Sequence, residues 1–573
     1  MDRNDVARSL LEIAAFLELK GENPFRVRAY QQAARAIQAY AGDLQTAIAN
    51  GVLAEMKGVG PATETVVRDL LATGQSRVLE RLRDEVPPGL VEMLGISGLG
   101  VAKVRQIHED LHVHSLDELE EAARDGRLAR LPRFGAKTAA NVLKGIASLR
   151  QSVGARLLHH ARTAAADLER VLGQLPEIRR VMIVGAVRRY REIVRDLDFV
   201  VEPAVTPDVL YDRLGRAPGV TEFVRRQERA VTLRFTGGTV ADIFLATPDQ
   251  WGFHVLRGTG SAEHVAALRE RATGLGLTWT DAGLARDGVL VPTKDEAAAY
   301  RLLNLPVIPP ELREGRGEIE AAVAGKLPQL VERKDMRGFL HCHSNYSDGT
   351  NTVAEWAEGA VAAGYEYIGL TDHSEAALES GGLRGADIGR QHAEIDAVNR
   401  QCSDVHMLKG VEADILEDGT VDYTDEERRS FDFVIASVHT RFGQDERTMT
   451  ERVIRAMDDP TVAILGHPTG RLLLARDPFP LNLERVFRAA AERGVAIEIN
   501  ADPQRLDLDW RHVREAAAMG VIISIGADAH GVNQVSHADV GVALARKGWL
   551  TADQVLNARP LSGFLEHVAA RRG

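Results

Sequence analysis

The stretch Phe339-Leu340-His341-Cys342-His343 leads a short apolar run into two histidines, and similar runs that end in ligand-type side chains recur between residues 338 and 573. Short apolar runs that alternate with helical patterns predict a βα barrel, whose strand ends converge on one face. On a strand, the side chains at positions i and i+2 of a His-x-His or Asp-x-His pair point the same way. The potential ligands are His341, His343, Asp348, His373, Glu412, His439, His467, Asp528 and His530.

A single histidine at the end of a strand is most often a hydrogen-bonded loop residue. Nine ligand-type residues at the same end of successive strands favour a polynuclear metal site instead. Imidazole and carboxylate ligands together suit Zn²⁺ or Mn²⁺. Cys342 lies between two expected ligands, so we expect its side chain to face away from the metals.

The composition bounds the class of protein. A chain of 573 residues predicts three or four domains, and 45% hydrophobic with 27% charged residues is ordinary for a soluble globular protein. The N-terminus does not read as a signal peptide, and no apolar stretch approaches the ~18 to 20 residues that cross a bilayer. Two cysteines indicate a reducing, cytoplasmic location. The net charge of −12 argues mildly against nucleic acid as a partner, although net charge says little about local patches.

Three glycine-centred turns recur in the first 150 residues, and each opens a helical pattern: Lys57-Gly58-Val59-Gly60, Ser97-Gly98-Leu99-Gly100 and Arg133-Phe134-Gly135. Glycines allow a tight turn that exposes backbone N–H groups at a helix N-terminus, where anions bind. The turns resemble the helix-hairpin-helix, which holds the DNA backbone without reading its sequence. The residues expected to contact DNA here are Gly58, Gly60, Gly98, Gly100, Lys103 and Gly135.

The segment Asn23–Tyr30 resembles the opening of the N-terminal domain of family X DNA polymerases, the family of DNA polymerase beta. The resemblance implies that Arg26 and Tyr30 bind the 5′-phosphate of a gap. In the lyase members of the family, a lysine eight residues after the first hairpin glycine forms a Schiff base. That position is Val66 here, and valine cannot perform amine chemistry, so we expect no deoxyribose-phosphate lyase activity by that route.

The middle of the chain carries three carboxylates on predicted strands. The apolar strand Val181–Val184 is followed by Gly185, then by the pair Asp196 and Asp198, and a later strand supplies Asp242. The spacing of Asp196 and Asp198 puts both carboxylates on one face of a strand. Three carboxylates suit two Mg²⁺ ions that activate a 3′-hydroxyl and stabilise a leaving pyrophosphate.

The order Gly-x-x-Arg-Arg, Asp-x-Asp and a later strand Asp resembles the nucleotidyltransferase palm of the family X polymerases. The resemblance implies Mg²⁺ or Mn²⁺ at the three carboxylates and nucleotide binding by Gly185, Arg188, Arg189, Gly260 and Ser261. Two departures bear on activity. Ala186 replaces a serine that bonds the triphosphate, a loss on the order of 1 kcal/mol. Arg257-Gly258 replaces the aromatic pair that packs on the nucleotide sugar, which removes the usual discrimination against ribonucleotides.

The ligand motifs of the barrel resemble the PHP domain, named for polymerase and histidinol phosphatase. That resemblance implies a distorted seven-stranded βα barrel with up to three Mn²⁺ or Zn²⁺ ions. It also implies a metal-dependent 3′–5′ exonuclease and, as a finer expectation, cleavage at abasic sites. From their loop positions, Arg384, Arg441 and Arg471 are candidates for holding the substrate phosphate.

The sequence thus predicts a multidomain α/β protein similar to a family X polymerase fused to a PHP domain. The expected parts are a helical DNA-binding domain (1–85), helix-hairpin-helix fingers (86–150), a nucleotidyltransferase palm with a mixed sheet (151–250), a thumb (251–320), a linker (321–337) and the PHP barrel (338–573).

The resemblance implies a DNA repair enzyme that fills gaps and trims 3′ ends. Its partners would be dNTPs and gapped, nicked or 3′-ended DNA, with no membrane, and it would be a monomer associated with the nucleoid. Two alternatives stay open. One is a PHP nuclease with a degenerate, DNA-binding palm, which Ala186 and Arg257-Gly258 favour. The other is a small-molecule phosphatase of the histidinol-phosphate type, which leaves the hairpins and the palm unexplained.

Overall fold

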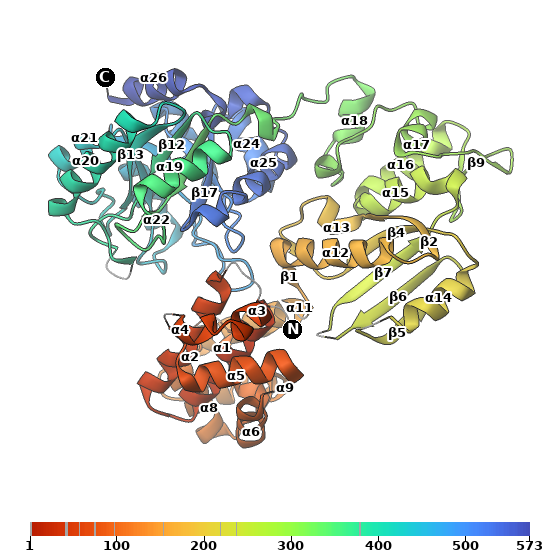
Figure 1. Cartoon of the computed structure of the whole chain (residues 1–573), viewed down its shortest axis with the longest axis horizontal. Helices are drawn as coiled ribbons and strands as arrows, with labels where there is room; N and C mark the ends of the chain where they lie inside the picture. Colours follow the sequence, from red (N-terminus) through yellow and green to blue (C-terminus); the bar gives the residue numbers. More distant parts are fainter. Residues whose placement is uncertain are drawn as a thin grey trace. The chain divides into compact units, whose positions relative to one another are not determined.

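The structure is a computed structural model that describes residues 3–40, 44–56, 58–73, 76–96, 98–152, 154–217, 219–236, 238–377 and 380–572. The chain divides into two compact units, Met1–Val153 and Gly154–Gly573. The first unit consists of helices, whereas the second contains sheets and the helices that cover them (Figure 1).

The first unit is helical because apolar side chains recur at helical spacing. In α1, Val6, Leu10, Ile13 and Leu17 are all buried and form one stripe. The side chain of Asn23 caps the start of α2. The helices are α1 (Arg3–Leu19), α2 (Pro24–Ala39), α3 (Leu44–Ala49), α4 (Val52–Glu55), α5 (Pro61–Thr73), α6 (Arg77–Glu85), α7 (Pro88–Leu94), α8 (Val101–Leu111), α9 (Leu116–Arg124), α10 (Arg127–Arg130) and α11 (Ala136–Ser152).

The second unit begins with a five-stranded mixed sheet in the order β2-β4-β7-β6-β5. Strands β4 and β7 are parallel, and the other neighbouring pairs are antiparallel. Leu197, Phe199 and Val201 of β4 join the core with residues of α12 and α14, so Asp198 points to the other face. The elements are β1 (Arg156–Leu157), α12 (Leu158–Gly173), β2 (Ile178–Ile183), α13 (Gly185–Arg188), β3 (Ile193–Val194), β4 (Leu197–Pro203), α14 (Pro207–Gly215), β5 (Val220–Arg226), β6 (Ala230–Phe235) and β7 (Val240–Leu245).

A smaller helical region with its own apolar core follows the mixed sheet. It carries a three-stranded sheet in the order β10-β9-β8. The elements are η1 (Pro248–Gln250), α15 (Trp251–Thr259), α16 (Ala262–Gly274), β8 (Thr278–Trp279), β9 (Leu284–Arg286), β10 (Val289–Leu290), α17 (Glu296–Leu302), η2 (Pro310–Leu312), α18 (Glu318–Val323) and η3 (Arg333–Asp335).

The last part of the chain is a closed barrel of seven strands, β11 to β17, and every neighbouring pair is parallel. The strands are almost entirely buried, as the continuous apolar runs predict. They are β11 (Gly338–Cys342), β12 (Tyr367–Leu370), β13 (His406–Asp414), β14 (Phe433–Ser437), β15 (Val462–Leu465), β16 (Ala496–Asn500) and β17 (Ile523–Ala529).

Helices cover the barrel and close one of its ends. Phe564 of α26 is fully buried and contacts Tyr367 and Phe433, which begin β12 and β14. The opposite end, where the strands finish, carries the ligand-type residues. The covering elements are α19 (Val353–Ala362), α20 (Gly385–Gln401), α21 (Asp425–Ser430), α22 (Glu446–Ala456), α23 (Leu483–Arg493), α24 (Trp510–Ala518), η5 (Val532–Gln534), α25 (His537–Lys547), η6 (Ala552–Gln554), η7 (Leu556–Ala558) and α26 (Leu561–Arg572).

The predicted fold class is confirmed: a helical N-terminal part, a mixed sheet with helices and a seven-stranded parallel barrel. The finer domain boundaries stay predictions. Among the described residues, no helix is long and apolar enough to cross a membrane.

Candidate active sites

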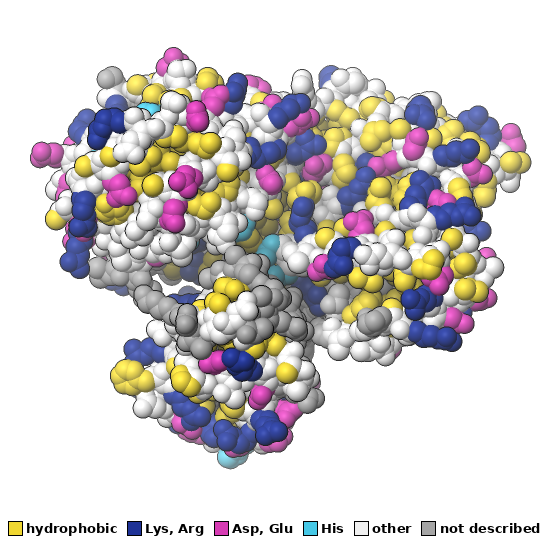
Figure 2. Space-filling model, in the orientation of Figure 1, with side chains coloured by type: hydrophobic (Ala, Val, Ile, Leu, Met, Phe, Trp, Pro, Cys, Tyr) yellow, Lys and Arg dark blue, Asp and Glu magenta, His cyan; other side chains and the backbone are white. Residues whose placement is uncertain are grey.

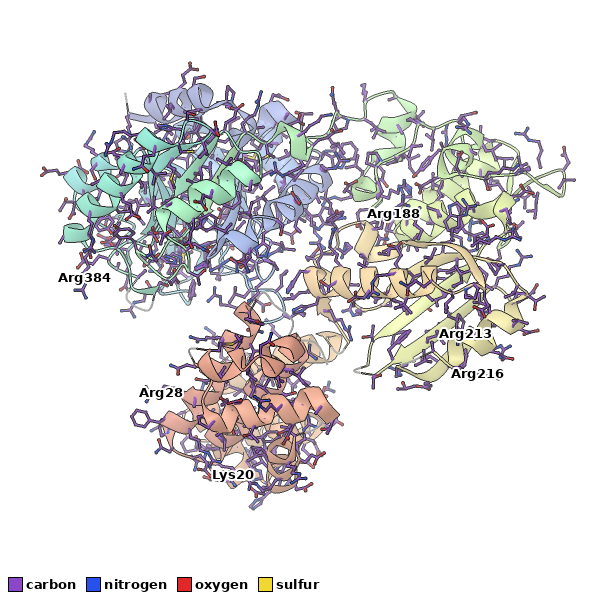
Figure 3. The ribbon with its side chains drawn as sticks, in the orientation of Figure 1. Lys20, Arg28, Arg188, Arg213, Arg216 and Arg384 are labelled. Atoms are coloured by element: carbon purple, nitrogen blue, oxygen red, sulfur yellow. The ribbon has the colours of Figure 1, made fainter. Side chains whose placement is uncertain are left out.

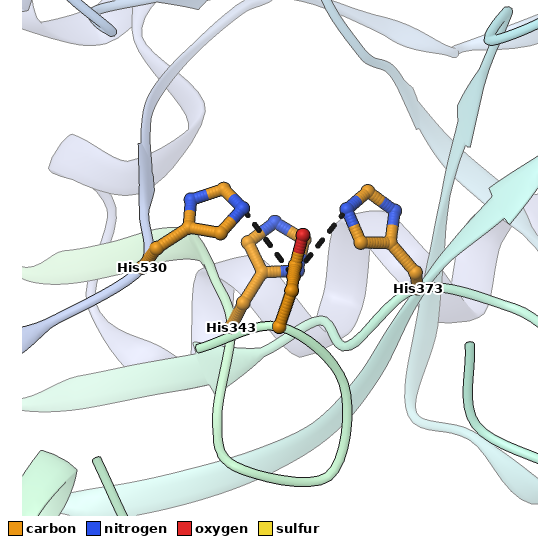
Figure 4. A group of neighbouring side chains, drawn as sticks. His343, His373 and His530 are labelled. Carbon is orange, nitrogen blue, oxygen red and sulfur yellow. Dashed lines mark ion pairs between the residues drawn. The ribbon is translucent and has the colours of Figure 1, made fainter. Parts of the chain in front are cut away.

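The strand ends of the barrel bring all nine predicted ligands to one place. Their donor atoms form three overlapping groups, in each of which the atoms lie within 4.8 Å of one another, and Glu412 brings in His467 at 2.8 Å. The groups are His343, Asp348, His373 and His530; His341, His343 and Asp528; and His373, Glu412 and His439. Figure 4 shows the imidazoles of His343, His373 and His530 gathered from separate segments of the barrel.

Glu412, on β13, is the hub of this cluster. It is fully buried, and its carboxylate lies 2.9 Å from His373 Nδ1, 3.3 Å from His439 Nε2 and 3.4 Å from His341 Nε2. Burial alone would raise the pKa of Glu412, but His439, His341 and His373 hold that pKa well below its usual range. The carboxylate is therefore ionised and faces several imidazole nitrogens at once.

Two further carboxylates orient the imidazoles from behind. Glu498 Oε1 lies 2.6 Å from His341 Nδ1, and Asp414 Oδ1 lies 2.6 Å from His439 Nδ1. In each histidine, Nε2 is buried and makes no hydrogen bond. Such carboxylate–histidine pairs direct the free ring nitrogen toward a metal.

The donor set fits divalent cations. The buried atoms without a hydrogen-bond partner include His341 Nε2, His343 Nδ1, His439 Nε2 and Glu412 Oε2. Unpaired buried polar atoms are costly unless something else binds them. Although burial opposes the charged imidazolium, Glu412 and Asp414 raise the pKa of His439 to about 10. The neighbouring carboxylates thus favour positive charge at this place, and mixed imidazole and carboxylate donors suit Zn²⁺ or Mn²⁺.

Local backbone geometry aims these residues. His341 and Asp528 adopt left-handed φ angles of 63° and 49°, which are uncommon for residues other than glycine. The β11 ladder shifts register between Leu340 and Cys342, so His341 and His343 do not lie on a regular strand. Cys342 belongs to the surrounding apolar core, away from the ligands, as expected.

Gly526 makes room for the carboxylate that orients His341. A Cβ atom at Gly526 would lie 1.8 Å from Glu498 Oε1 and 3.1 Å from His341 Cβ. Only glycine permits this approach.

The three arginines expected to hold the substrate phosphate have different surroundings. Arg471 is buried, pairs with Asp509 at 2.5 Å and donates to the Arg505 carbonyl. Arg441 is largely exposed and pairs with Glu417, whereas Arg384 lies on the outer surface (Figure 3). Their role as phosphate ligands stays a prediction.

Arg505 is a residue that the sequence reasoning missed. Its Nε lies 3.2 Å from Asp528 Oδ2, and its side chain is 20% exposed. It follows β16, which carries none of the nine predicted ligands. The loop after this strand was therefore not predicted to belong to the site. A basic residue in the loop after a barrel strand was the available signal.

The mixed sheet forms a second metal-type site. Asp196, Asp198 and Asp242 place carboxylate oxygens within 4.8 Å of one another, and Asp198 pairs with Asp242 in the β4–β7 ladder. Burial and the neighbouring Asp196 and Asp242 raise the pKa of Asp198 to about 7. Three carboxylates this close together repel one another, and a bound Mg²⁺ or Mn²⁺ ion would offset that repulsion.

Gly185 allows the chain to pass over Asp198. Its φ is +64°, and a Cβ atom there would lie 1.9 Å from Asp198 Oδ2. The glycine of the Gly-x-x-Arg-Arg motif is therefore required by the carboxylate beneath it.

The two arginines of this motif are engaged by polar groups. Arg188 donates to Thr259 Oγ1 at 2.6 Å and pairs with Glu296 at 2.9 Å. Arg189 donates to the Thr259 carbonyl at 2.6 Å and pairs with Glu314 at 3.1 Å. The motif is thus tied to the segment that leads into Gly260 and Ser261, whose predicted nucleotide contacts stay predictions.

In the first unit, the hairpin glycines have the expected conformations. Gly58 and Gly98 have φ angles of 97° and 85°, and Gly60 and Gly100 have open space where a Cβ would be. Gly135 immediately precedes α11. Lys57 and Ser97 lie outside the described residues.

The predicted 5′-phosphate ligands differ in exposure. Arg26 is exposed and pairs with Glu22 at 3.3 Å, whereas Tyr30 is 4% exposed, and its burial raises its pKa. Lys103 is half-buried and donates to the Gly98 carbonyl. Val66, at the place of the lyase lysine, is buried in the core. Figure 2 shows basic and acidic side chains interspersed over the viewed face of the described residues.

Four family models match successive parts of the chain. They are described as Helix-hairpin-helix domain (residues 1–76), SAM-like Helix-hairpin-helix tandem (90–148), DNA polymerase beta thumb (254–314) and PHP domain (340–502). These matches agree with the order of parts that the motifs predicted.

Two kinds of curated relatives are similar to this chain. A protein named DNA polymerase/3′-5′ exonuclease PolX, from Bacillus subtilis (strain 168), is 34% identical over 98% of both chains. Proteins named probable phosphatase from Thermoanaerobacter sp. (strain X514) and Acetivibrio thermocellus are 30% and 31% identical, but over only 36% and 39% of this chain. Since the first relative aligns over nearly the whole of both chains, this chain belongs to the PolX family of DNA polymerase/3′-5′ exonucleases.

Proposed function

We propose that this protein fills gaps in DNA at the mixed sheet and removes nucleotides from 3′ ends at the barrel. One observation carries the proposal: among the described residues, metal-type ligands gather at two separate places, three carboxylates on the sheet and, on the barrel, eight grouped donors with His467 beside Glu412. Divalent cations at such groups supply the Lewis-acid chemistry of phosphoryl transfer.

At the mixed sheet, Asp196 and Asp198 would hold two ions, and Asp242 would share the one at which the primer hydroxyl is activated. Gly185 keeps the chain clear of Asp198. Arg188 and Arg189 fix the segment around Thr259. The incoming nucleotide would lie between this segment and the three carboxylates.

At the barrel, the protein supplies ligands and positive charge, and the proposed reaction requires no covalent nucleophile. Glu498 and Asp414 fix the ring orientations of His341 and His439. The guanidinium of Arg505, beside Asp528, is placed to neutralise a phosphodiester that approaches the cluster. This arrangement suits hydrolysis of a phosphodiester by water.

We further propose gapped, nicked or 3′-ended DNA as the substrate, repair as the role and, as an extension of the same chemistry, cleavage at abasic sites. The helix-hairpin-helix parts support DNA as the partner. We also propose that the protein acts as a monomer in the cytoplasm, at the nucleoid.

The test uses the purified full chain on a 5′-phosphorylated one-nucleotide gap, with Mg²⁺ or Mn²⁺, and with or without dNTPs. We expect Asp198→Ala to abolish incorporation and to retain digestion of the 3′ end. His341→Ala should do the reverse. Loss of both activities in each variant would contradict two separable sites.

A second candidate is a PHP nuclease whose sheet only binds DNA. The engagement of Arg188 by Glu296 and of Arg189 by Glu314 favours it, because both guanidiniums are already paired. Incorporation that disappears in Asp198→Ala would exclude this candidate. The phosphatase alternative would gain support only if histidinol phosphate were hydrolysed far faster than single-stranded DNA.

A further inference from the structure

The last residue of helix α25, Lys547, belongs to the barrel but contacts the polymerase part of the same compact unit. Its side chain is fully buried. Its ammonium donates to the Arg189 carbonyl at 2.9 Å, to the Glu311 carbonyl at 3.4 Å and to Glu314 Oε1 at 2.5 Å. All three acceptors lie outside the barrel, in the part of the same compact unit that precedes it in the chain.

The contacts of Lys547 continue toward the proposed nucleotide site. Glu314, which Lys547 binds, also accepts from Arg189 Nε at 3.1 Å and pairs with Arg191 at 3.3 Å. Arg189 in turn donates to the Thr259 carbonyl at 2.6 Å, next to Gly260. One continuous set of charge-assisted hydrogen bonds therefore joins the barrel to the segment proposed to bind nucleotide.

A second contact holds the same surfaces together. Trp510, which begins α24 of the barrel, donates through its indole N–H to Glu192 at 3.1 Å. Arg511 pairs with Glu192 at 2.7 Å. The ammonium of Lys547 lies 4.3 Å from the centre of the Trp510 ring, within the range of a cation–π interaction. Lys547 is thus confined on several sides.

We propose that Lys547 is a positioning residue for nucleotide binding by the polymerase, acting through Glu314 and Arg189. The proposal rests on the proposed gap-filling function of the mixed sheet. Removal of one member of a buried charged group changes the balance of charge among the others, and they rearrange. Without the ammonium, Glu314 keeps only arginine partners, and the Arg189 carbonyl loses its donor. Arg189 then shifts, and the segment at Thr259 shifts with it.

The test compares Lys547→Met with Lys547→Arg in the full chain, by single-nucleotide gap filling. For Lys547→Met we expect a KM for dNTP about tenfold higher, with kcat changed by less than about threefold, because ground-state positioning is lost but the carboxylates are intact. Lys547→Arg keeps the charge and should recover most of the effect. Exonuclease activity should persist in both variants, which shows that the barrel is folded.

A matched control removes a lysine–glutamate pair elsewhere. Lys334 is mostly exposed and pairs with Glu332 at 2.6 Å. Lys334→Met should leave the KM for dNTP unchanged.

A pH profile adds a readout that a purely structural role would not move. The groups that face Lys547 are Glu314, Arg189, Arg191 and Trp510, and burial lowers the pKa of Lys547 to about 8. The KM for dNTP of the wild type should therefore rise above pH 8, and that of Lys547→Arg should stay flat.

Binding of dNTP to a gap with a dideoxy-terminated primer separates the possible failures, since it needs no turnover. If the wild type binds and incorporates dNTP and Lys547→Met behaves identically, the positioning role is wrong and the gap-filling function stands. If the wild type neither binds nor incorporates dNTP, the gap-filling function and the positioning role of Lys547 are both wrong. Equal loss of incorporation and exonuclease activity in Lys547→Met, without recovery in Lys547→Arg, would show that Lys547 supports only the fold.

Discussion

Glu498 Oε1 lies 2.6 Å from His341 Nδ1, and its other oxygen accepts from the backbone N–H of His467 at 2.7 Å. One buried carboxylate thus contacts two predicted metal ligands, through the ring of His341 in β11 and through the backbone of His467, which follows β15. Gly526 leaves the space that this carboxylate occupies. Glu498 contacts predicted metal ligands but is not one of them. Its loss should therefore weaken metal binding without removing a ligand atom.

We expect Glu498→Gln to weaken metal binding at the barrel by 10- to 100-fold, the usual effect of removing an orienting partner of a metal-bound histidine. The amide keeps the volume but loses the negative charge that fixes the His341 ring. Exonuclease activity titrated against Mn²⁺ measures this, and saturating Mn²⁺ should restore much of the rate. Unchanged half-saturation would contradict the orienting role.

Arg505 should affect the exonuclease through the substrate. We expect Arg505→Gln to lower the exonuclease kcat on the order of 10²-fold, because a charge-assisted donor to the phosphate is lost. Mn²⁺ half-saturation should not increase, since Asp528 loses a competing cation. Arg441→Gln, at an exposed residue paired with Glu417, is the control. If Arg441→Gln lost more activity than Arg505→Gln, Arg441 and not Arg505 would be the residue that holds the substrate phosphate.

The sequence pattern was sufficient for the barrel and for the ligands at its strand ends, because both depend on local order. Almost all of the predicted ligands end an apolar run, and Asp348, in the loop after β11, is the exception. For the others, the packing and the partners of the side chains did not have to be known. The same holds for Asp196 and Asp198, whose spacing places them on one face. Figure 1 shows how these local segments assemble into sheet and barrel.

The residues that support these ligands were not predictable in the same way. Glu498 and Asp414 are acidic side chains in buried strands, and only the closed barrel shows which histidines they face. Arg188 pairs with Glu296, and Arg189 pairs with Glu314. In each pair the two residues are more than a hundred positions apart in the sequence. No local periodicity encodes such pairs, because they depend on how two distant elements pack.

Metal binding at the mixed sheet should release a proton near neutral pH. The pKa of Asp198 is raised to about 7, above that of an exposed carboxyl, by burial and by Asp196 and Asp242. Below pH 7 the carboxyl is mostly protonated and must ionise to bind Mg²⁺, so affinity should rise about tenfold per pH unit up to 7 and then level off.

Calorimetry at pH 6 in two buffers with different ionisation enthalpies measures the released proton. The difference between the wild type and Asp198→Asn isolates the mixed sheet, because both proteins keep the barrel ligands. A wild type that released no more protons than Asp198→Asn would show that Asp198 is ionised before the metal binds.

Gly185→Ala should abolish gap filling and spare the exonuclease. The added methyl group would lie 1.9 Å from Asp198 Oδ2, and the residue must keep a φ of +64°. Gly276→Ala separates these two effects, because Gly276 has a φ of +70° with open space around it. Both variants carry a left-handed alanine, but only Gly185→Ala displaces a carboxylate, so only it should lose incorporation in the one-nucleotide gap assay. Similar losses in both would assign the effect to backbone strain and not to the contact with Asp198.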